Sequence, residues 1–294
     1  ADRVTVFRDG LSQPPATTET LDPDELITRM LGRQLNQMFP AKAKTITDPI
    51  MNVDEFETEG LAEPLSFELR KGEIIGLAGQ LGSGTSSLLR GLSGTQPALG
   101  GRVTIDGDET VIRSPADALA VGMAYCSDDR KFDGFFGIRR VTENLTAPGL
   151  ERVTPGGFLN RRKERQLASS LASMVSVGQS RIRHRVNTLS GGNQQKVTVG
   201  KWLGAEPKIL LINEPTRGVD VGARAEIYST LRDLANQGLA VVFASSDMNE
   251  ILGLGDSIIS FFRGQVINQY TGEEATQETL TRDISNPTLH AGTA

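Results

Sequence analysis

A short buried strand that runs straight into a glycine-rich loop and then a helix constrains the fold of this chain most. The strand is predicted over 73–78, where the residues are mainly apolar. The loop is Gly79-Gln80-Leu81-Gly82-Ser83-Gly84-Thr85-Ser86, and a helix is predicted over 86–92. Two more apolar runs, at 208–212 and 239–244, are typical of buried parallel strands. Strands and helices that alternate around a glycine loop predict an α/β fold.

Two other stretches have different periodicities. Apolar residues alternate over 53–69, which predicts antiparallel strands. Residues 162–177 have helical spacing through Leu167 and Leu171. Because the composition changes over about 130–188, we expect a separate helical unit there.

Composition excludes several classes of protein. The 294 residues are 38% apolar and 23% charged, as in an ordinary globular protein. The net charge of -5 and the pI of about 5.3 argue against a dedicated nucleic-acid binder. The single cysteine, Cys126, excludes a disulfide framework and a cysteine-cluster zinc site, and we expect it to be a buried thiol. No apolar run approaches the roughly 18 residues that span a bilayer, so contact with a membrane is expected to go through a partner.

Two polar runs carry the chemistry. The first is Leu189-Ser190-Gly191-Gly192-Asn193-Gln194-Gln195-Lys196, a glycine turn that leads into a helix and points free N–H groups at an anion. The second is Asn213-Glu214-Pro215-Thr216-Arg217-Gly218-Val219-Asp220, which follows a buried strand. A strand that ends in such polar residues is where the metal and the attacking water of a nucleotide would be held.

Together these runs resemble the signature motif and the Walker B region of ABC-transporter ATPases. LSGGNQQK followed by EPTRGVDVGA is similar to the ribose, galactose or xylose importer branch of that superfamily. The resemblance covers nearly the whole chain. It implies a P-loop ABC ATPase with a parallel-sheet core, an antiparallel β subdomain and a helical subdomain over about 130–188.

The resemblance also implies ATP and Mg²⁺ as cofactors and a set of residues for them. Residues 79–86 are the P-loop, Ser86 and Asn213 contact the metal, and Glu214 is the catalytic base. The remaining expected nucleotide contacts are Asp128, Ser190, Gly191, Gly192, Asp220 and Ser246. Paired ATPase domains of this family work head to tail, so Ser190, Gly191 and Gly192 serve the nucleotide on a partner's P-loop.

Four positions depart from the family pattern. Thr85 replaces the P-loop lysine, which removes the cation that neutralises the β- and γ-phosphates. Asn213 replaces an aspartate and offers Mg²⁺ a neutral ligand. Ser246 stands where the family has a histidine, and Asp128 stands at its glutamine, in a DDRK run that resembles the EDRK of second-copy domains. We therefore expect a weakened nucleotide site at this chain's own P-loop beside an intact LSGG surface.

The two ends of the chain resemble each other. Residues 2–10 (DRVTVFRDG) parallel 256–264 (DSIISFFRG), and 26–29 parallel 279–282, at offsets of 254 and 253 residues. This predicts a tandem repeat, in which residues 1–45 are the tail of a preceding ATPase domain and 46–294 are the second domain. The alternative is that two strand-turn-glycine segments are alike by accident.

The leading hypothesis is the C-terminal half of the ATP-binding subunit of a monosaccharide importer, at the cytoplasmic face of the membrane. Its expected partners are the preceding ATPase domain, a membrane permease and, through the permease, an extracytoplasmic sugar-binding protein, with no nucleic acid. One alternative is a non-hydrolysing nucleotide-binding module that supports its partner domain. Another is an ABC ATPase acting on DNA or ribosomes, which the acidic pI disfavours.

Overall fold

The computed structural model describes residues 1–8, 11–19, 21–22, 25–26, 28–29, 38–42, 46–271 and 274–285. Parts of the predicted tail and repeat lie outside the described residues, among them Asp9, Gly10 and Ile27. The last residues of the predicted second domain, 286–294, also lie outside them.

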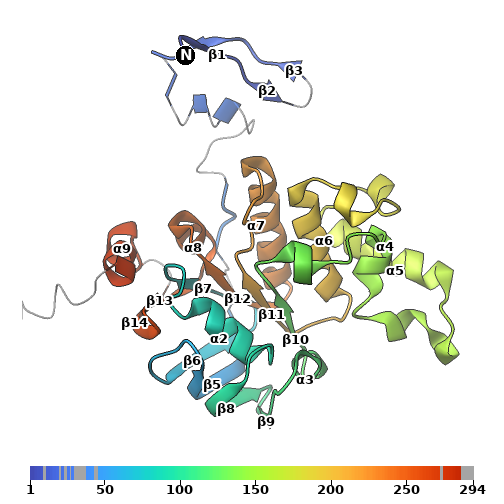
Figure 1. Ribbon diagram of the computed structural model, residues 1–294, viewed down its shortest axis with the longest axis vertical. Helices are drawn as coiled ribbons and strands as arrows, with labels where there is room; N and C mark the ends of the chain where they lie inside the picture. The colour runs from blue at the N-terminus through green and yellow to red at the C-terminus, as the bar shows by residue number, and fades with distance from the viewer. Residues whose placement is uncertain are drawn as a thin grey trace, which may run out of the picture.

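A six-stranded sheet forms the centre of the fold (Figure 1). Its strands, in spatial order, are β10 (Met123–Cys126), β11 (Ile209–Asn213), β12 (Ala240–Ser245), β7 (Ile74–Ala78), β13 (Ser257–Phe262) and β14 (Gln265–Thr271). The first five are parallel, and β14 pairs with β13 in the antiparallel sense. The three strands predicted from apolar runs are confirmed within one residue at each end, and all of their residues are buried.

The predicted antiparallel strands form a second sheet. Its strands, in spatial order, are β6 (Leu65–Arg70), β5 (Pro49–Thr58), β8 (Ala98–Ile105) and β9 (Asp108–Thr110). In β6 buried and exposed residues alternate, as expected for a sheet with one face on the core. The predicted antiparallel subdomain is confirmed.

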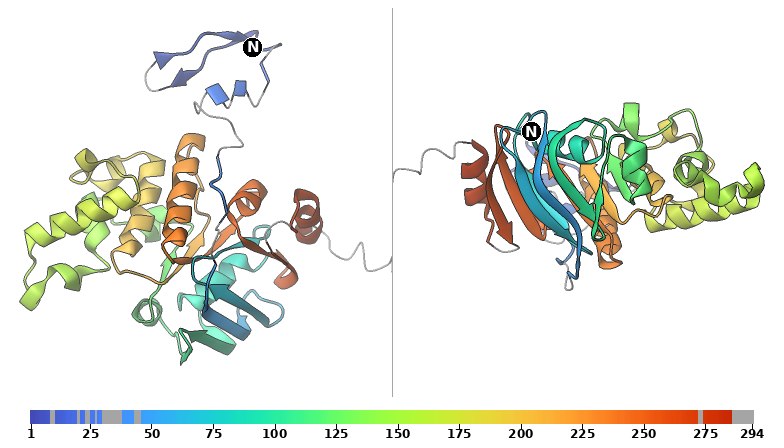
Figure 2. Two further views of the ribbon diagram at one scale, coloured as in Figure 1. Left: turned by 180° about the vertical axis from the view of Figure 1, so that it is seen from behind. Right: turned by 90° about the horizontal axis from the view of Figure 1, so that it is seen from below.

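Eight α-helices lie within the described residues 46–271 and 274–285. They are α2 (Thr85–Leu92), α3 (Pro115–Ala120), α4 (Val141–Thr146), α5 (Arg161–Met174), α6 (Gly191–Leu203), α7 (Val221–Asn236), α8 (Met248–Leu254) and α9 (Gln277–Ser285). The helix predicted over 162–177 is α5, which ends earlier because Ser176 adopts a φ of 53°, outside the helical range. α4, α5 and α6 pack on one another, so the helical unit continues beyond 188 (Figure 2).

Successive residues of the central strands pack into two different cores. Leu210 and Ile212 of β11 face a core shared with α4 to α8, whereas Ile209 and Leu211 face the second sheet and α2. Cys126 is fully buried in the first of these cores, as expected, and burial raises the pKa of its thiol to about 12. Both faces of the parallel sheet are therefore covered.

Near the N-terminus four short strands form a hairpin that lies apart from the sheets (Figure 1). They are β1 (Arg3–Val4), β2 (Phe7–Arg8), β3 (Leu11–Ser12) and β4 (Ala16–Thr17). Their pairs are Arg3↔Thr17, Val4↔Ala16, Phe7↔Ser12 and Arg8↔Leu11. The β13–β14 hairpin has pairs at an offset of 254 residues from each of these: Ser257↔Thr271, Ile258↔Tyr270, Phe261↔Val266 and Phe262↔Gln265.

The segment 38–42 joins this hairpin to the main body. Phe39 stacks on Tyr228 of α7, with ring centroids 4.8 Å apart and an interplanar angle of 22°. A side chain at Gly253 of α8 would collide with the Phe39 ring, since an added Cβ would lie 2.4 Å from it. Among the described helices none is both long enough and apolar enough to cross a membrane.

Candidate functional site

The glycine loop lies open to solvent between β7 and α2. Leu81 is fully exposed, and a Cβ added at Gly82 would meet nothing within 4 Å. Gly84 has a φ of 106°, and a Cβ there would lie 3.0 Å from the carbonyl oxygen of Gly60. The loop therefore requires glycine at 84 and leaves room for a ligand over 80–82.

Helices α2 and α6 start without side-chain caps. Among the described residues no side chain caps α2 at Gly84, and Ser190 does not cap α6, because its hydroxyl accepts from the Asn193 amide over 2.7 Å. By contrast, side chains cap the starts of α3, α5, α7 and α8. The first N–H groups of α2 and α6 are thus available to an anion, as the two sequence runs predict.

Three predicted site residues from distant parts of the sequence meet at the end of β11. The Ser86 hydroxyl donates to Oδ1 of Asn213 over 3.1 Å. The Asn213 amide nitrogen donates to Oδ1 of Asp128, also over 3.1 Å, and Asn213 is only 2% exposed. Thr85, at the lysine position, is buried beside Ser83, with the two hydroxyl oxygens 3.5 Å apart.

Glu214 occupies a strained backbone position. Its φ is 52°, in the left-handed region that non-glycine residues rarely adopt. Its carboxylate accepts from the amide N–H of Ser246 over 2.9 Å, and its own N–H donates to the carbonyl of Ala244. Such strain is concentrated at functional sites, and here it accompanies the contact between the predicted base and Ser246.

The residues that could bind a magnesium ion provide too few charged oxygens to hold it without a nucleotide. Ser86 and Asn213 provide neutral oxygens, and Asp128 is the carboxylate next to them. Mg²⁺ favours oxygen ligands with charge and keeps several waters or phosphate oxygens. These residues fit a metal that is bound mainly through a nucleotide's phosphates, for which Ser86 would be the direct ligand and the ion would neutralise phosphate charge.

Arg130 ties the DDRK turn to the run that follows β11. Its guanidinium donates to the carbonyls of Arg217 and Gly218, the second over 3.1 Å, and partial burial lowers its pKa. Asp128 forms an ion pair with Arg217 over 3.1 Å. The turn continues into a short π-helix, Arg130–Gly134, a rare form that is frequent at functional sites.

The LSGG residues lie in the helical unit and contact the same run. A Cβ on Gly191 would lie 3.0 Å from the carbonyl oxygen of Gly218 and 3.1 Å from Nη2 of Arg130. A Cβ on Gly192 would lie 2.4 Å from Cβ of Ala223, so this glycine lets α6 approach α7. Asp220 caps α7 by accepting from the Ala223 amide over 2.9 Å, and its contact with nucleotide stays a prediction.

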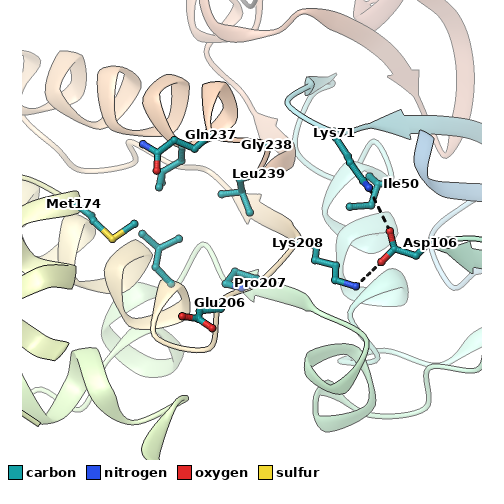
Figure 3. Close-up of a pocket in the computed structure, with 12 residues that line it drawn as sticks. Ile50, Lys71, Asp106, Met174, Glu206, Pro207, Lys208, Gln237, Gly238 and Leu239 are labelled. Carbon is teal, nitrogen blue, oxygen red and sulfur yellow. Dashed lines mark hydrogen bonds and ion pairs between the residues drawn. The ribbon is translucent and has the colours of Figure 1, made fainter. Parts of the chain in front are cut away.

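A cavity of about 530 Å³ lies at the opposite edge of the sheet, where the parallel strands begin (Figure 3). Lys71 and Lys208 pair with Asp106 at one side of it, and Met174 and Leu239 line the other. Ligands of open α/β sheets bind beyond the carboxyl ends of the strands, so this cavity is not the candidate site.

Sequence reasoning missed two residues that organise the site, Arg130 and Glu250. The DDRK run was a signal for Arg130. Glu250 is a single carboxylate in the first turn of α8, and its buried partners in space cannot be read from sequence.

Comparison with known proteins identifies the family of the chain. A family model described as ABC transporter matches residues 62–217. The ribose import ATP-binding protein RbsA of Geobacillus kaustophilus is 39% identical over 281 residues, which are 96% of this chain and 57% of that protein. RbsA 1 of Rhizobium meliloti is 37% identical over 282 residues, 96% of this chain and 56% of that protein. The chain thus spans about half the length of these curated relatives.

Solved structures agree on the fold. An ATP-binding cassette of an ABC transporter, in its ADP conformation, superposes with a TM-score of 0.67 at 20% identity, covering 82% of this chain and 97% of that one. The cbiO1 protein of Clostridium perfringens, part of an ABC transporter complex, gives 0.68 at 20% identity, covering 83% and 98%. The predicted cassette fold is confirmed, and the chain belongs to the ABC transporter family.

Proposed function

We propose that this chain is a nucleotide-binding domain of a monosaccharide importer and couples ATP binding and hydrolysis to transport through a permease. One observation carries the proposal: Ser86, Asn213 and Asp128 form a hydrogen-bonded chain at the carboxyl end of β11, beside Glu214 held by Ser246. Open α/β sheets bind nucleotides at this edge. The names of its relatives as ribose import ATP-binding proteins support the sugar substrate.

The chain has two surfaces that would contact nucleotide, its own P-loop and its LSGG run, and they differ in how closely they follow the family pattern. Thr85 and Asn213 leave its own P-loop without the lysine and the aspartate of the family pattern. No side chain caps the N–H groups at the start of α6, and Gly191 packs closely against the Gly218 carbonyl and Arg130. We infer that the competent site pairs this domain's Ser190, Gly191 and Gly192 with the P-loop of a partner domain.

We infer that the partner is a preceding ATPase domain of the same protein, whose last part is residues 1–45. The N-terminal hairpin repeats the strand register of the β13–β14 hairpin at an offset of 254 residues in all four of its pairs. If the two segments were alike by accident, their strands would have no reason to pair in the same register. Phe7 and Leu11 are 75% and 69% exposed on this hairpin, which favours a missing neighbour.

A second surface supports contact with a permease. A cavity of about 230 Å³ between the central sheet and α6 is lined by apolar and aromatic side chains, among them Pro115, Tyr125 and Trp202. Phe132 and Phe136, 87% and 59% exposed, lie on the adjoining segment. Exposed aromatic groups around an apolar pocket are typical of protein interfaces. The expected location is therefore peripheral, at the cytoplasmic face of the membrane, with the sugar-binding protein reached through the permease and no nucleic acid partner.

Calorimetry of Mg-ATP binding to this chain, followed by phosphate release from the full tandem protein with permease, tests the proposal. We expect weak binding and little or no turnover by this chain alone. Losing one charge-assisted contact costs on the order of 1.5–3 kcal/mol, roughly tenfold to a hundredfold in affinity. Submicromolar binding with robust turnover would contradict the asymmetry. If Glu214→Gln and Gly191→Asp both left tandem turnover unchanged, a non-hydrolysing supporting module would be the better description.

A further inference from the structure

A buried carboxylate lies behind the candidate site without being part of it. Glu250, on α8, is 1% exposed. Its Oε1 accepts from the Thr216 hydroxyl over 2.9 Å, and its Oε2 accepts from the Ser245 hydroxyl. Thr216 is two residues after Glu214, and Ser245 immediately precedes Ser246. One side chain thus bridges the two segments that also meet through the Glu214 N–H and the Ala244 carbonyl, and through the Ser246 amide and the Glu214 carboxylate.

The same hydroxyl groups have further partners. The Ser245 oxygen also accepts from the amide of Asp247 over 3.0 Å, so it fixes the first turn of α8. The Thr216 hydroxyl lies 3.4 Å from the Tyr228 hydroxyl of α7. Glu250 therefore sits at the junction of β11, β12, α7 and α8, and both of its oxygens are used.

We propose that Glu250 is a positioning residue of the nucleotide site, whose carboxylate sets the placement of Glu214 against Ser246. Its role in ATP chemistry rests on the proposed function, whereas its hold on the two segments does not. In the ionised form each Glu250 oxygen accepts a hydroxyl proton. A proton on Oε2 would reverse this bond, so that Glu250 donates to the Ser245 oxygen and the Ser245 hydrogen loses its acceptor, which changes the hydrogen bonding of the 245–247 turn.

Glu250 changes its protonation state close to neutral pH. Burial raises its pKa to about 7, although the hydrogen bonds from Ser245 and Thr216 lower it. Asp247, at the start of α8, raises it further, and Asp247 is itself paired with Arg224 of α7 over 3.1 Å. Tyr228 also faces the carboxylate, and burial raises the pKa of this phenol, so it stays neutral. Glu250 therefore changes its charge near neutral pH.

Glu73 provides a matched control. It is likewise buried, at 5% exposure, burial raises its pKa, and it accepts from the Ser257 hydroxyl over 2.6 Å and from the Arg70 amide. It precedes β7, at the opposite edge of the sheet from Glu214. Glu73→Gln should share any general effect of neutralising a buried glutamate and leave the nucleotide edge alone.

Amide NMR of the ligand-free chain between pH 5.5 and 8.5 tests the positioning directly. In the unmodified chain and in Glu73→Gln, we expect the Ser246 and Asp247 amide resonances to titrate with a midpoint near 7. In Glu250→Gln they should not titrate. Titration that persists in Glu250→Gln, or that is absent from the unmodified chain, would overturn the proposal. Should Glu250→Gln not fold, Thr216→Val removes one donor to the carboxylate, and the midpoint must then move upward.

Binding of Mg-ATP at pH 6 and pH 8 tests the consequence for function. We expect about threefold to tenfold tighter binding at pH 8 for the unmodified chain and Glu73→Gln than for Glu250→Gln, with the difference gone at pH 6. Protonation of the nucleotide's own phosphate is common to all three proteins and cancels in the comparison. If no protein binds nucleotide, the proposed function fails, and the NMR titration still decides the role of Glu250. If binding occurs and Glu250→Gln matches the unmodified chain at both pH values, the positioning role is wrong.

Discussion

The Asn213 side chain accepts from the Ser86 hydroxyl through Oδ1 and donates to Asp128 through Nδ2, each over 3.1 Å. A carboxylate at 213 could only accept, and it would face the Asp128 carboxylate. The asparagine that departs from the family pattern thus takes part in a hydrogen-bonded chain that needs no cation. The effect of restoring the aspartate should therefore depend on whether a cation is present.

Asn213→Asp should destabilise the chain without metal and recover with Mg²⁺. Two facing carboxylates disfavour the folded state by about 1–3 kcal/mol, which a divalent cation offsets. Thermal unfolding in chelator and in millimolar Mg²⁺ measures this. Asn268→Asp is the control, because the Asn268 amide also donates to a buried aspartate, Asp283, over 3.0 Å. It should be destabilised equally in both buffers, and an Asn213→Asp variant that behaved the same way would contradict the assignment.

Thr85→Lys combined with Asn213→Asp should raise Mg-ATP affinity by more than the two single changes add up to. The lysine neutralises phosphate charge, and the aspartate retains the metal that bridges the same phosphates, so the two gains depend on each other. A double-mutant cycle by calorimetry gives the coupling energy. Strict additivity, or no gain in affinity, would count against the assignment of these two positions.

Gly191→Asp should reduce phosphate release by the full tandem protein about a hundredfold, whereas Ser86→Ala should change it far less. A side chain at 191 meets the Gly218 carbonyl and Arg130, and it blocks the start of α6 that would face the partner's nucleotide. Ser86 belongs to the site that already lacks its lysine. A larger loss from Ser86→Ala would mean that this domain's own P-loop is the working one.

Arg130→Lys should loosen the run that follows Glu214 without unfolding the chain. Lysine keeps the charge and cannot reach the Arg217 and Gly218 carbonyls with a planar two-point contact. Amide hydrogen exchange of residues 217–220 should rise severalfold. Arg102→Lys, which alters an exposed ion pair with Glu109, should leave it unchanged. Equal exchange in both variants would show that Arg130 does not restrain this run.

Glu250→Gln should become relatively more stable as the pH rises. The folded state holds the Glu250 proton more tightly than the ordinary glutamate pKa of 4.5 allows, since burial raises that pKa to about 7. The stabilisation is complete below pH 4.5 and is lost as the pH rises through 7. The variant's neutral side chain avoids this loss, on the order of 3 kcal/mol. Urea unfolding of both proteins at pH 5.5 and 8.5 measures the change, and a pH-independent difference would contradict it.

The sequence predicted the central strands and the helix after the glycine loop well, because short stretches of residues determine them. Apolar runs located β7, β11 and β12, and the glycine loop located α2. The helical unit was drawn too short, because the packing of α6 on α4 and α5 joins segments far apart in the sequence. Ser176 ends α5 through its backbone angle, for which serine gives no clear signal.

The site was predicted in part for the same reason. Ser86, Asn213, Glu214 and Ser246 came from motifs, and their meeting at one edge follows from parallel strands. The Arg130 contacts span 87 and 88 residues, and the Glu250 contact with Thr216 spans 34. Such contacts between distant segments depend on the tertiary structure, and no local pattern in the sequence predicts them.

The stacking of Phe39 on Tyr228 gives the molecule a mechanical joint. The ring is seated against Gly253 of α8 and against α7, whose Tyr228 hydroxyl neighbours Thr216. Met38 packs against the same core as Phe39, so a displacement of the chain at these two residues would be passed on close to the segment that carries Glu214. A small movement of this segment would therefore reach the predicted catalytic base over a short path.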